Sequence, residues 1–308
     1  MNKIIKDISS IKVQGATKVA FASLLLVKNS LRKLSWPPQK KYFDLVADQA
    51  GLIGRLRSTE PLTRNLIRWL LLEAFTIYKK NNNRENFNKY LNALYNRAIG
   101  HYTDVEDSIV RTALKKINDG DNVFTHCHSS LVEKILIAAK QSGKKITVYH
   151  TETRPLFQGR ITEKNLRKAG VKSFMVADSA AAYLVSKHSG DDISIDLVVL
   201  GADALLADGS VINKIGSFGI ALAAYDSKIP VYVASSLLKF DIDSTTKIEM
   251  RSSGEIWPNH PSKTRILNYA FDRIPAKIIS GIISEAGVIK PAQVAKLAKK
   301  YYLQLFNK

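Results

Sequence analysis

The chain has 308 residues, 45% hydrophobic and 24% charged, a composition that excludes a disordered chain and allows two domains with a substantial core. No run of about eighteen apolar residues occurs, and residues 1–10 lack the apolar core of a secretory signal. No membrane is therefore expected as a partner, and a cytoplasmic location is expected. The single cysteine, Cys127, excludes an intramolecular disulfide and a site built from several thiolates.

The formal net charge is +19 and the isoelectric point is near 9.8, so the surface would attract polyanions, including nucleic acid and phosphorylated metabolites. The lysines are scattered along the chain rather than gathered in one stripe. This distribution is more typical of a solvated basic surface than of a nucleic-acid footprint, so nucleic acid is not expected as a partner.

Residues 1–118 are predicted to form a helical N-terminal domain, because apolar residues recur at helical spacing and few segments resemble strands. Trp36-Pro37-Pro38 and the polar run 79–88 separate the helices, and Thr59-Glu60-Pro61 starts one of them with proline at an early position. Helices are expected at 11–28, 42–57, 59–75 and 90–118.

Residues 119–308 show a different rhythm, in which short apolar segments alternate with helical ones. Such alternation predicts a Rossmann-like parallel sheet with right-handed crossovers. The fold class is therefore α/β, a helical domain followed by a Rossmann-like domain. Strands are expected at 123–126, 146–150, 173–176, 197–200 and 231–234, and helices at 130–141, 162–169, 179–187 and 218–224.

Three expected strands end in polar clusters, at 125–130, 151–155 and 201–203. Because the carboxyl ends of parallel strands lie along one edge of a sheet, these clusters can meet. Asp203 stands at the tip of its strand, and Asn213 and Lys214 follow it. Spacing alone leaves two interpretations equally open, a ligand-binding trio or a turn acid with a capping amide and a solvated lysine.

Cys127 precedes a helix that begins at Ser129-Ser130, whose N-terminal end would lower the thiol pKa, as would charge on His126 and His128. A buried structural cysteine is the other interpretation, but the position among the polar clusters favours a reactive thiol. A metal site is not expected, because alternation along a strand directs the thiol away from both histidines and no further ligands have suitable spacing. A Cys-His pair for acyl transfer stays open without any local signature.

The segment 152–159 places an acid, a guanidinium and an amide just beyond a strand. Arg154 is a candidate for binding phosphate, or for an ion pair with Glu152 that holds the loop. Gln158 beside Gly159 suits a backbone that approaches a ligand closely. Since neither a GxGxxG nor a GxxxxGK[ST] motif occurs, no dinucleotide or ATP cofactor is expected, and none of any other kind.

Five motifs occur together in the chain, HCHSSLV at 126–132, ETRPLFQGR at 152–160, GADALLADGSVINKIGS at 201–217, SSLLKFD at 235–241 and FDRIPAKIISGIISEAGVI at 271–289. With this set the chain resembles a superfamily that contains the alpha, beta and delta subunits of eukaryotic translation initiation factor 2B. The same superfamily contains two sugar-phosphate isomerases, methylthioribose-1-phosphate isomerase and ribose-1,5-bisphosphate isomerase.

The resemblance implies a set of site residues. Cys127 and Asp203 match the catalytic pair of the isomerases, and the remaining matches are expected to bind substrate. These are Gln14, Gly15 and Ala16, which match an RGA motif, together with Gln158, Asn213, Lys214 and Lys239. Backbone N–H groups at Ser129 and Ser130 are expected to hold phosphate.

Two positions depart from the isomerase pattern. Gln14 replaces the arginine of the RGA motif, and Glu60 replaces the arginine of a TRPT motif. A carboxylate in place of a guanidinium would repel phosphate instead of attracting it. Either Arg57 or Arg64 substitutes for it, or the ligand differs from that of the family.

The resemblance implies an aldose-ketose isomerase for a C1-phosphorylated pentose, with ribose 1,5-bisphosphate as the expected substrate. In this hypothesis Asp203 is a protonated acid near the ring oxygen, and Cys127 is a thiolate that removes the C2 proton. A homo-oligomer, either a dimer or a hexamer, and a nucleotide activator are expected. The alternative is a non-catalytic subunit, similar to the initiation-factor regulators, that binds a nucleotide or a sugar phosphate in the same cleft.

Overall fold

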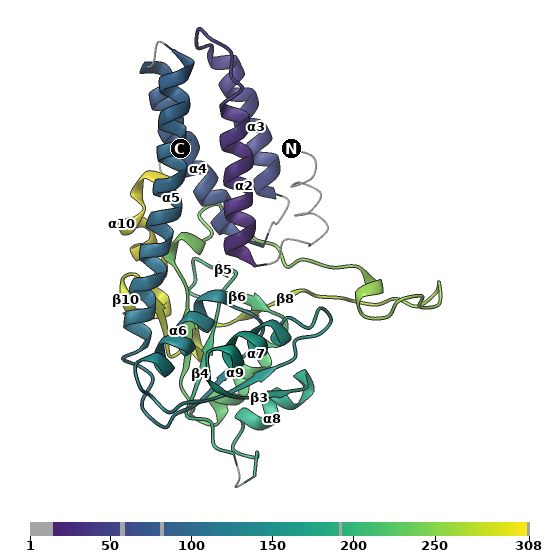
Figure 1. Cartoon of the computed structure of the whole chain (residues 1–308). Helices are drawn as coiled ribbons and strands as arrows, with labels where there is room; N and C mark the ends of the chain where they lie inside the picture. The colour runs from purple at the N-terminus through teal and green to yellow at the C-terminus, as the bar shows by residue number, and fades with distance from the viewer. Residues whose placement is uncertain (1–14, 56–58, 81–82, 191–192, 307–308) are drawn as a thin grey trace.

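The computed structural model describes residues 15–55, 59–80, 83–190 and 193–306. Long helices rise from a sheet-containing part of the molecule (Figure 1). They are α2 (Ala16–Leu31), α3 (Lys40–Arg55), α4 (Pro61–Lys80) and α5 (Arg84–Ala113). The four predicted helices are thus confirmed apart from their ends, since 15, 59–60 and 114–118 are not helical and 11–14, 56 and 57 lie outside the described residues. The polar connector is shorter than expected, because the Asn83 side chain accepts a 2.8 Å hydrogen bond from the Asn86 N–H and starts α5.

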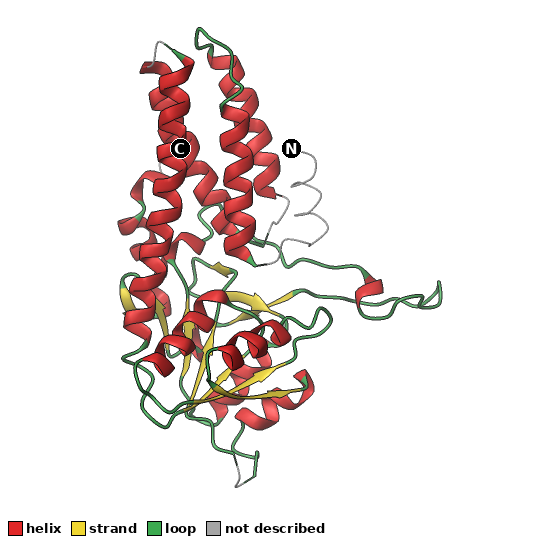
Figure 2. Cartoon of the chain, viewed as in Figure 1, coloured by secondary structure: helices red, strands yellow, loops and turns green. Residues whose placement is uncertain are grey.

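A seven-stranded sheet forms the centre of the second half, in the order β10-β9-β7-β4-β1-β2-β3 (Figure 2). Its strands are parallel except for β10, which pairs antiparallel with β9 at the edge. The strands are β1 (Asn122–Thr125), β2 (Thr147–Thr151), β3 (Lys172–Val176), β4 (Leu197–Leu200), β7 (Val231–Ala234), β9 (Gly281–Ser284) and β10 (Gly287–Ile289). The five predicted strands and the predicted α/β class are confirmed.

Helices cover both faces of this sheet. They are α6 (Ser130–Gln141), α7 (Gly159–Lys168), α8 (Ala181–Val185) and α9 (Ser217–Asp226), whereas α10 (Val294–Tyr301) packs against the 3-10 turn Leu237–Lys239. Along β4, Leu197 and Val199 pack in one apolar cluster, while Val198 and Leu200 pack in another. Because side chains alternate across a strand, this division explains why β4 is apolar at every position.

A smaller antiparallel sheet was not predicted. It consists of β5 (Ala204–Leu205), β6 (Val211–Lys214) and β8 (Phe271–Ile274). Asn213 and Lys214, expected just before a helix, lie on β6 and are each only 6% exposed. Asp203 leads into this sheet, and its N–H donates a 2.8 Å hydrogen bond to the Ile212 carbonyl. The small sheet therefore brings three predicted site residues together.

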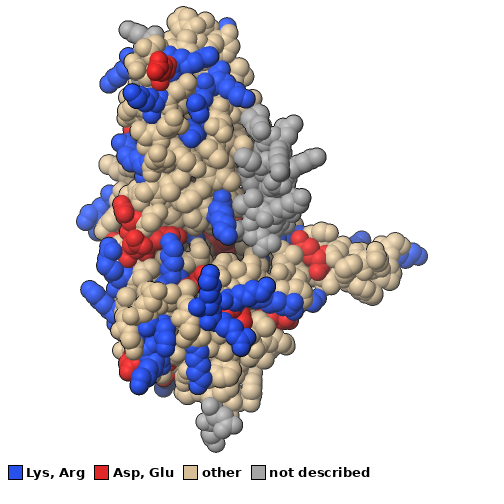
Figure 3. Space-filling model, viewed as in Figure 1, with Lys and Arg blue, Asp and Glu red and all other residues tan. Residues whose placement is uncertain are grey.

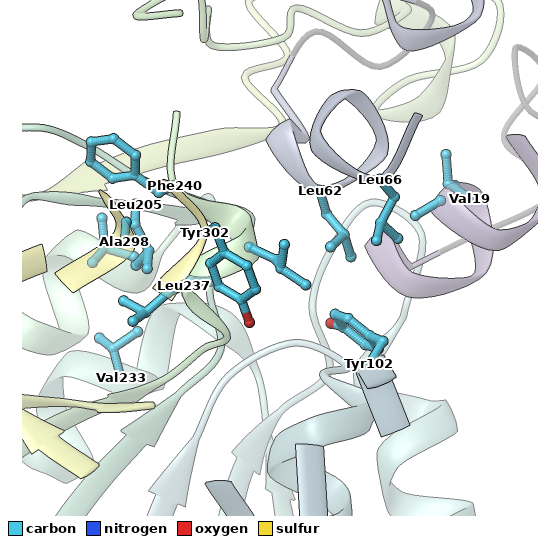
Figure 4. Packing of buried hydrophobic residues seen from close by; sticks show 14 of the residues in the cluster. Val19, Leu62, Leu66, Tyr102, Leu205, Val233, Leu237, Phe240, Ala298 and Tyr302 are labelled. Carbon is cyan, nitrogen blue, oxygen red and sulfur yellow. The ribbon is translucent and has the colours of Figure 1, made fainter. Parts of the chain in front are cut away.

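One apolar cluster extends from the helices into the sheet region. Figure 4 shows Leu62, Leu66 and Tyr102 on the helical side and Leu237 and Val233 on the other side of the same cluster. Helix α5 contacts α2 and α4 as well as α6 and β9. A division into domains at 118/119 stays a prediction, and the core packing is continuous across that position.

Residues 242–270, here called the arm, leave the body of the molecule and return to begin β8 (Figures 1 and 2). Hydrogen bonds fix the base of the arm. Arg64 forms a 3.1 Å ion pair with Asp241, and the Thr59 hydroxyl donates a 2.7 Å hydrogen bond to the Lys247 carbonyl. The arm is therefore attached to the helical part beside Glu60.

Within the described residues, no helix combines the length and apolar character needed to cross a bilayer. Lysine and arginine side chains are spread over the helical part and the sheet part on the face seen in Figure 3, with acidic residues also visible between the two parts. This spread agrees with the expectation of a solvated basic surface.

Candidate functional site

The sheet order reverses between β1 and β4, which is where open α/β sheets form a crevice for ligands. The loop after β1 carries Cys127, the loop after β4 carries Asp203, and both residues line one cavity. The same cavity is lined by other predicted residues, namely Gly15, Ala16, Ser129, Ser130, Gln158, Asn213, Lys214 and Lys239. Most of the predicted site is thus brought together by the fold.

Two predicted residues are not placed in this cavity. Gln14 lies outside the described residues, and Arg154 does not line the cavity wall. The exposed Arg154 guanidinium lies 4.9 Å from the centre of the Phe157 ring, and the Arg154 N–H donates a 2.6 Å hydrogen bond to Asp178. The predicted ion pair of Glu152 is made with Arg160 instead, at 3.4 Å.

The turn between β1 and α6 holds Cys127 in a left-handed conformation, with φ of 68°. Strand β1 ends at Thr125, so the alternation argument for residues 126–128 does not apply. The thiol is 9% exposed and donates a 3.5 Å hydrogen bond to Oε1 of Gln158. The backbone conformation, rather than strand alternation, directs the sulfur into the cavity.

The expectation of a thiolate at Cys127 is wrong, because the pKa of the thiol is raised and not lowered. Burial raises the pKa of Cys127 to about 11, and the charge of Asp203 adds to the increase. The Lys214 charge and a hydrogen bond from the His128 backbone lower this pKa but do not offset burial. Desolvation disfavours the anion more than the start of α6 favours it, so the proton stays on sulfur at neutral pH.

His126 and His128 do not activate the thiol. Burial lowers the pKa of His126 to about 4, so its ring is neutral. Since a carbonyl only accepts, Nε2–H donates to the Ile215 carbonyl at 2.8 Å, and Nδ1 accepts from the Thr151 hydroxyl at 2.6 Å. Nδ1 of His128 faces the Thr162 hydroxyl at 3.1 Å. Neither ring is bonded to sulfur, which removes the support for a Cys-His pair.

Buried cations surround the pair formed by Cys127 and Asp203. Lys239 is 8% exposed and its Nζ donates a 2.7 Å hydrogen bond to the Ala202 carbonyl. Nζ of Lys214 lies 5.3 Å from the centre of the Phe271 ring, near enough to Cys127 to affect its pKa. Ammonium groups buried to this degree are stabilised by an anionic ligand.

Two helix N-termini also face the cavity. The first turn of α2 contributes Ala16, Thr17 and Lys18, and the start of α6 contributes Ser130 and Leu131. Unpaired N–H groups and the helix dipole make such positions favourable for phosphate. Together with the lysines, they make the cavity a site for an anionic ligand.

Comparison with known proteins agrees with this geometry. The Initiation factor 2 subunit family matches residues 12–291. The chain belongs to this family. It is 30% identical to ribose 1,5-bisphosphate isomerase of Methanocaldococcus jannaschii, over 96% of the chain and 94% of that protein. It is 29% identical to methylthioribose-1-phosphate isomerase of Desulforamulus reducens, over 96% of the chain and 88% of that protein.

Two solved structures share the fold of this chain. Translation initiation factor eIF-2B of Pyrococcus horikoshii superposes with a TM-score of 0.77 and 22% identity, covering 94% of this chain and 97% of that one. A chain of the tetrameric eIF2B-beta2-delta2 complex of C. thermophilum gives a TM-score of 0.73 and 20% identity, covering 98% and 94%. The second of these neighbours is thus a chain of a tetrameric complex.

In this family member, Glu60 is 1% exposed and lines the cavity, as does Glu106 at 4% exposed. Arg64 does not replace the missing guanidinium, because it does not line the cavity and pairs with Asp241 instead. Arg57 lies outside the described residues. The departure at Glu60 is therefore located in the site itself.

Several residues of this family member's cavity were not predicted. They are Thr17, Lys18, Glu106, Leu131, Arg251 and Phe271. Lys18 adjoins the QGA segment, so proximity in sequence was an available signal. Arg251 comes from the arm, and no motif or periodicity connects that segment to the site. Among the described residues, no three His, Cys, Asp or Glu side chains are grouped to hold a metal ion.

The protonation of Cys127 is directly measurable because the chain has one cysteine. With its pKa near 11, roughly one thiol in ten thousand is ionised at pH 7, so alkylation by iodoacetamide will be slow and will accelerate at high pH. Asp203→Asn should lower the pKa and Lys214→Met should raise it, since these charges act in opposite directions. Absorbance of the thiolate against pH measures the thiol pKa in the wild type and in both variants. A wild-type pKa at or below 8 would contradict a protonated Cys127 at neutral pH.

Proposed function

We propose that this chain is an aldose-ketose isomerase that converts ribose 1,5-bisphosphate into ribulose 1,5-bisphosphate. The observation that carries the proposal is the meeting of the Cys127 thiol and the Asp203 carboxyl group in one cavity with buried Lys214. The names of relatives such as the Methanocaldococcus jannaschii isomerase support the substrate class. The match covers most of the length of these relatives and most of this chain, so the support for an isomerase applies to the whole chain.

The proposed reaction requires one acid and one base. A pentose that carries phosphate on O1 has no free anomeric hydroxyl, so its ring cannot open by ordinary mutarotation. Opening therefore needs a proton donor at the ring oxygen, and isomerisation needs a base at C2. Two neighbouring groups with separated proton affinities meet both needs.

The structure supports roles opposite to those expected from the resemblance. Because the proton resides on sulfur in the described site, we assign Cys127 as the acid that protonates the ring oxygen. Asp203 is then the base that removes the C2 proton, giving an enol phosphate. A bound phosphate would raise the thiol pKa further by its negative charge, so ligand binding reinforces this assignment.

The same two groups complete the proposed cycle. The thiolate left on Cys127 takes the proton of the C2 hydroxyl while Asp203 returns its proton to C1. A ketone forms at C2 and a CH2 group at C1, and both side chains regain their starting states. Lys214, Lys239, Asn213 and the starts of α2 and α6 are proposed to hold the phosphates and the developing negative charge.

An isomerase assay on the purified protein tests the function. Ketose should form from ribose 1,5-bisphosphate, and Cys127→Ser and Asp203→Asn should lower kcat by about 10²–10⁴-fold, since each removes one proton-transfer group. Asp226→Asn, which alters an exposed carboxylate on α9, is the matched control and should leave kcat unchanged. Methylthioribose 1-phosphate and ribose 1-phosphate serve as competing substrates.

Absence of ketose from all three sugars would sink the isomerase proposal. Glu60 in the cavity favours the second candidate, a non-catalytic subunit that binds a nucleotide or sugar phosphate. That candidate predicts ligand binding that Cys127→Ser and Asp203→Asn leave unchanged.

The alkaline pH profile distinguishes the two assignments of Cys127. If the thiol is the acid, kcat/KM will stay level from neutral pH to about pH 10 and fall only as the thiol ionises near pH 11. If the thiolate were the base, kcat/KM would rise about tenfold per pH unit over that range. The acidic limb is less informative, because burial raises the pKa of Asp272, which accepts from the N–H groups that start α9, to about 6.

We further propose a homo-oligomer with at least two copies, located in the cytoplasm. An apolar patch on β3, α8 and α9 supports self-association, because exposed apolar clusters commonly mark protein interfaces. It consists of Phe174, Tyr183, Phe218, Leu222 and Tyr225. A cytoplasmic location is consistent with the single cysteine, because the cytoplasm keeps free thiols reduced. A nucleotide activator and the choice between dimer and hexamer stay predictions.

Charge placed in the patch should break the oligomer. Leu222→Glu combined with Tyr225→Glu would bury two carboxylates in the interface, so the sedimentation coefficient should fall toward that of a single copy. Leu45→Glu, on α3 and at least as exposed to solvent, is the control that should not dissociate it. An unchanged oligomer in the double variant would place the interface elsewhere.

A further inference from the structure

Arg251 reaches the cavity from the arm rather than from the sheet or the helices. Its backbone is fixed where the two sides of the arm pair, since the Arg251 N–H donates a 2.9 Å hydrogen bond to the Asn268 carbonyl. On the neighbouring pair, the Ala270 N–H donates to the Glu249 carbonyl at 2.9 Å. Residues 249–251 and 268–270 thus hold the arginine at the point where the chain enters β8.

The Arg251 side chain is 5% exposed, and its guanidinium is charged at any physiological pH. Nε lies 3.3 Å from Oε1 of Glu249, yet neither Nε nor Nη1 makes a hydrogen bond with any of the residues that the structure describes. Burying N–H donors of a charged group without acceptors is unfavourable. The cavity wall therefore contains a guanidinium with unfilled hydrogen-bonding capacity.

The position of Arg251 matters because of the acids around it. Glu60 and Glu106 lie in the same cavity wall, on the helical side, where carboxylates disfavour an anion, although Lys134 pairs with Glu106. The described residues contribute Lys18, Lys214, Lys239 and Arg251 as the cations that oppose them. Of these, Arg251 alone offers a planar fork that can bind two phosphate oxygens at once.

We propose that Arg251 binds a phosphate group of the sugar ligand. It would supply, from the arm, the guanidinium that is absent at position 60, where the chain has a glutamate. The inference deepens the proposed isomerase function and rests on it for the identity of the sugar. Phosphate oxygens would accept from the Nε and Nη1 groups, which have no hydrogen-bond partner within the described segments. Arg251 is thus a binding residue that makes the arm part of the site.

The experiment measures binding of inorganic phosphate by calorimetry in wild-type protein, Arg251→Gln, Arg251→Lys and Arg265→Gln. Hydrogen bonds to charged groups predict a weakening of about 10–100-fold for Arg251→Gln. Arg251→Lys keeps the charge but not the fork, so its loss should be smaller. Arg265 is exposed on the same arm, and Arg265→Gln should bind like wild type.

Thermal unfolding without ligand separates binding from a structural role. Because Nε and Nη1 of Arg251 have no hydrogen-bond partner among the described residues, Arg251→Gln should melt no lower than wild type, whereas a structural role of the ion pair with Glu249 predicts a lower Tm. Equal phosphate binding by Arg251→Gln and Arg265→Gln, or no phosphate binding by the wild type, would overturn the inference. Equally weakened phosphate binding in Arg251→Gln and Arg265→Gln would also overturn the inference, because such a result would reflect the general charge of the arm.

Turnover distinguishes failure of this inference from failure of the proposed function. If Arg251 binds the C5 phosphate, Arg251→Gln should raise KM for ribose 1,5-bisphosphate and leave KM for ribose 1-phosphate unchanged. If Arg251 binds the C1 phosphate, KM should rise for both sugars. Normal turnover of ribose 1,5-bisphosphate by Arg251→Gln contradicts the inference alone. Phosphate binding that depends on Arg251 without any turnover supports the inference and contradicts the isomerase function.

Discussion

The parallel pairing of β1 with β4 is the constraint on which the site depends. Val123 pairs with Leu197 and Phe124 with Val198, so the two strands end side by side. The loops that follow then lie in contact, and a Cβ on Gly201 would come within 2.7 Å of the Ser129 hydroxyl. Because crossover connections run in opposite directions from this pair, no helix fills the space above it. Cys127 and Asp203 meet there for this reason.

Electrostatics within that space explains its chemistry. Burial of a carboxylate and several ammonium groups costs desolvation free energy, and attraction between the opposite charges offsets part of that cost. The balance leaves the proton on Cys127, although Lys214 acts in the opposite direction. An anionic sugar completes the charge balance of the lysines. The cavity is thus better suited to bind a phosphorylated ligand than to ionise its cysteine unaided.

Supporting contacts outside the cavity position the cations. The Glu285 carboxylate accepts from the Ser236 hydroxyl at 3.0 Å, the Leu237 N–H at 3.0 Å and the Tyr302 hydroxyl at 2.6 Å. These bonds hold the 3-10 turn Leu237–Lys239, whose lysine reaches the Ala202 carbonyl. Similarly, pairing of β6 with β8 holds Lys214 against Phe271. Residues remote from the ligand therefore determine where positive charge lies.

The sequence by itself determined the α/β class, the five main strands and most of the cavity, since apolar periodicity and polar strand ends are local signals. Tertiary structure decided that Asn213 and Lys214 lie on a strand, because β6 exists only through its distant partner β8. It also decided that Arg154 points away and that Arg251 enters from the arm. The protonation state of Cys127 could not be predicted from the sequence, because desolvation of the thiol depends on every segment that covers the sulfur.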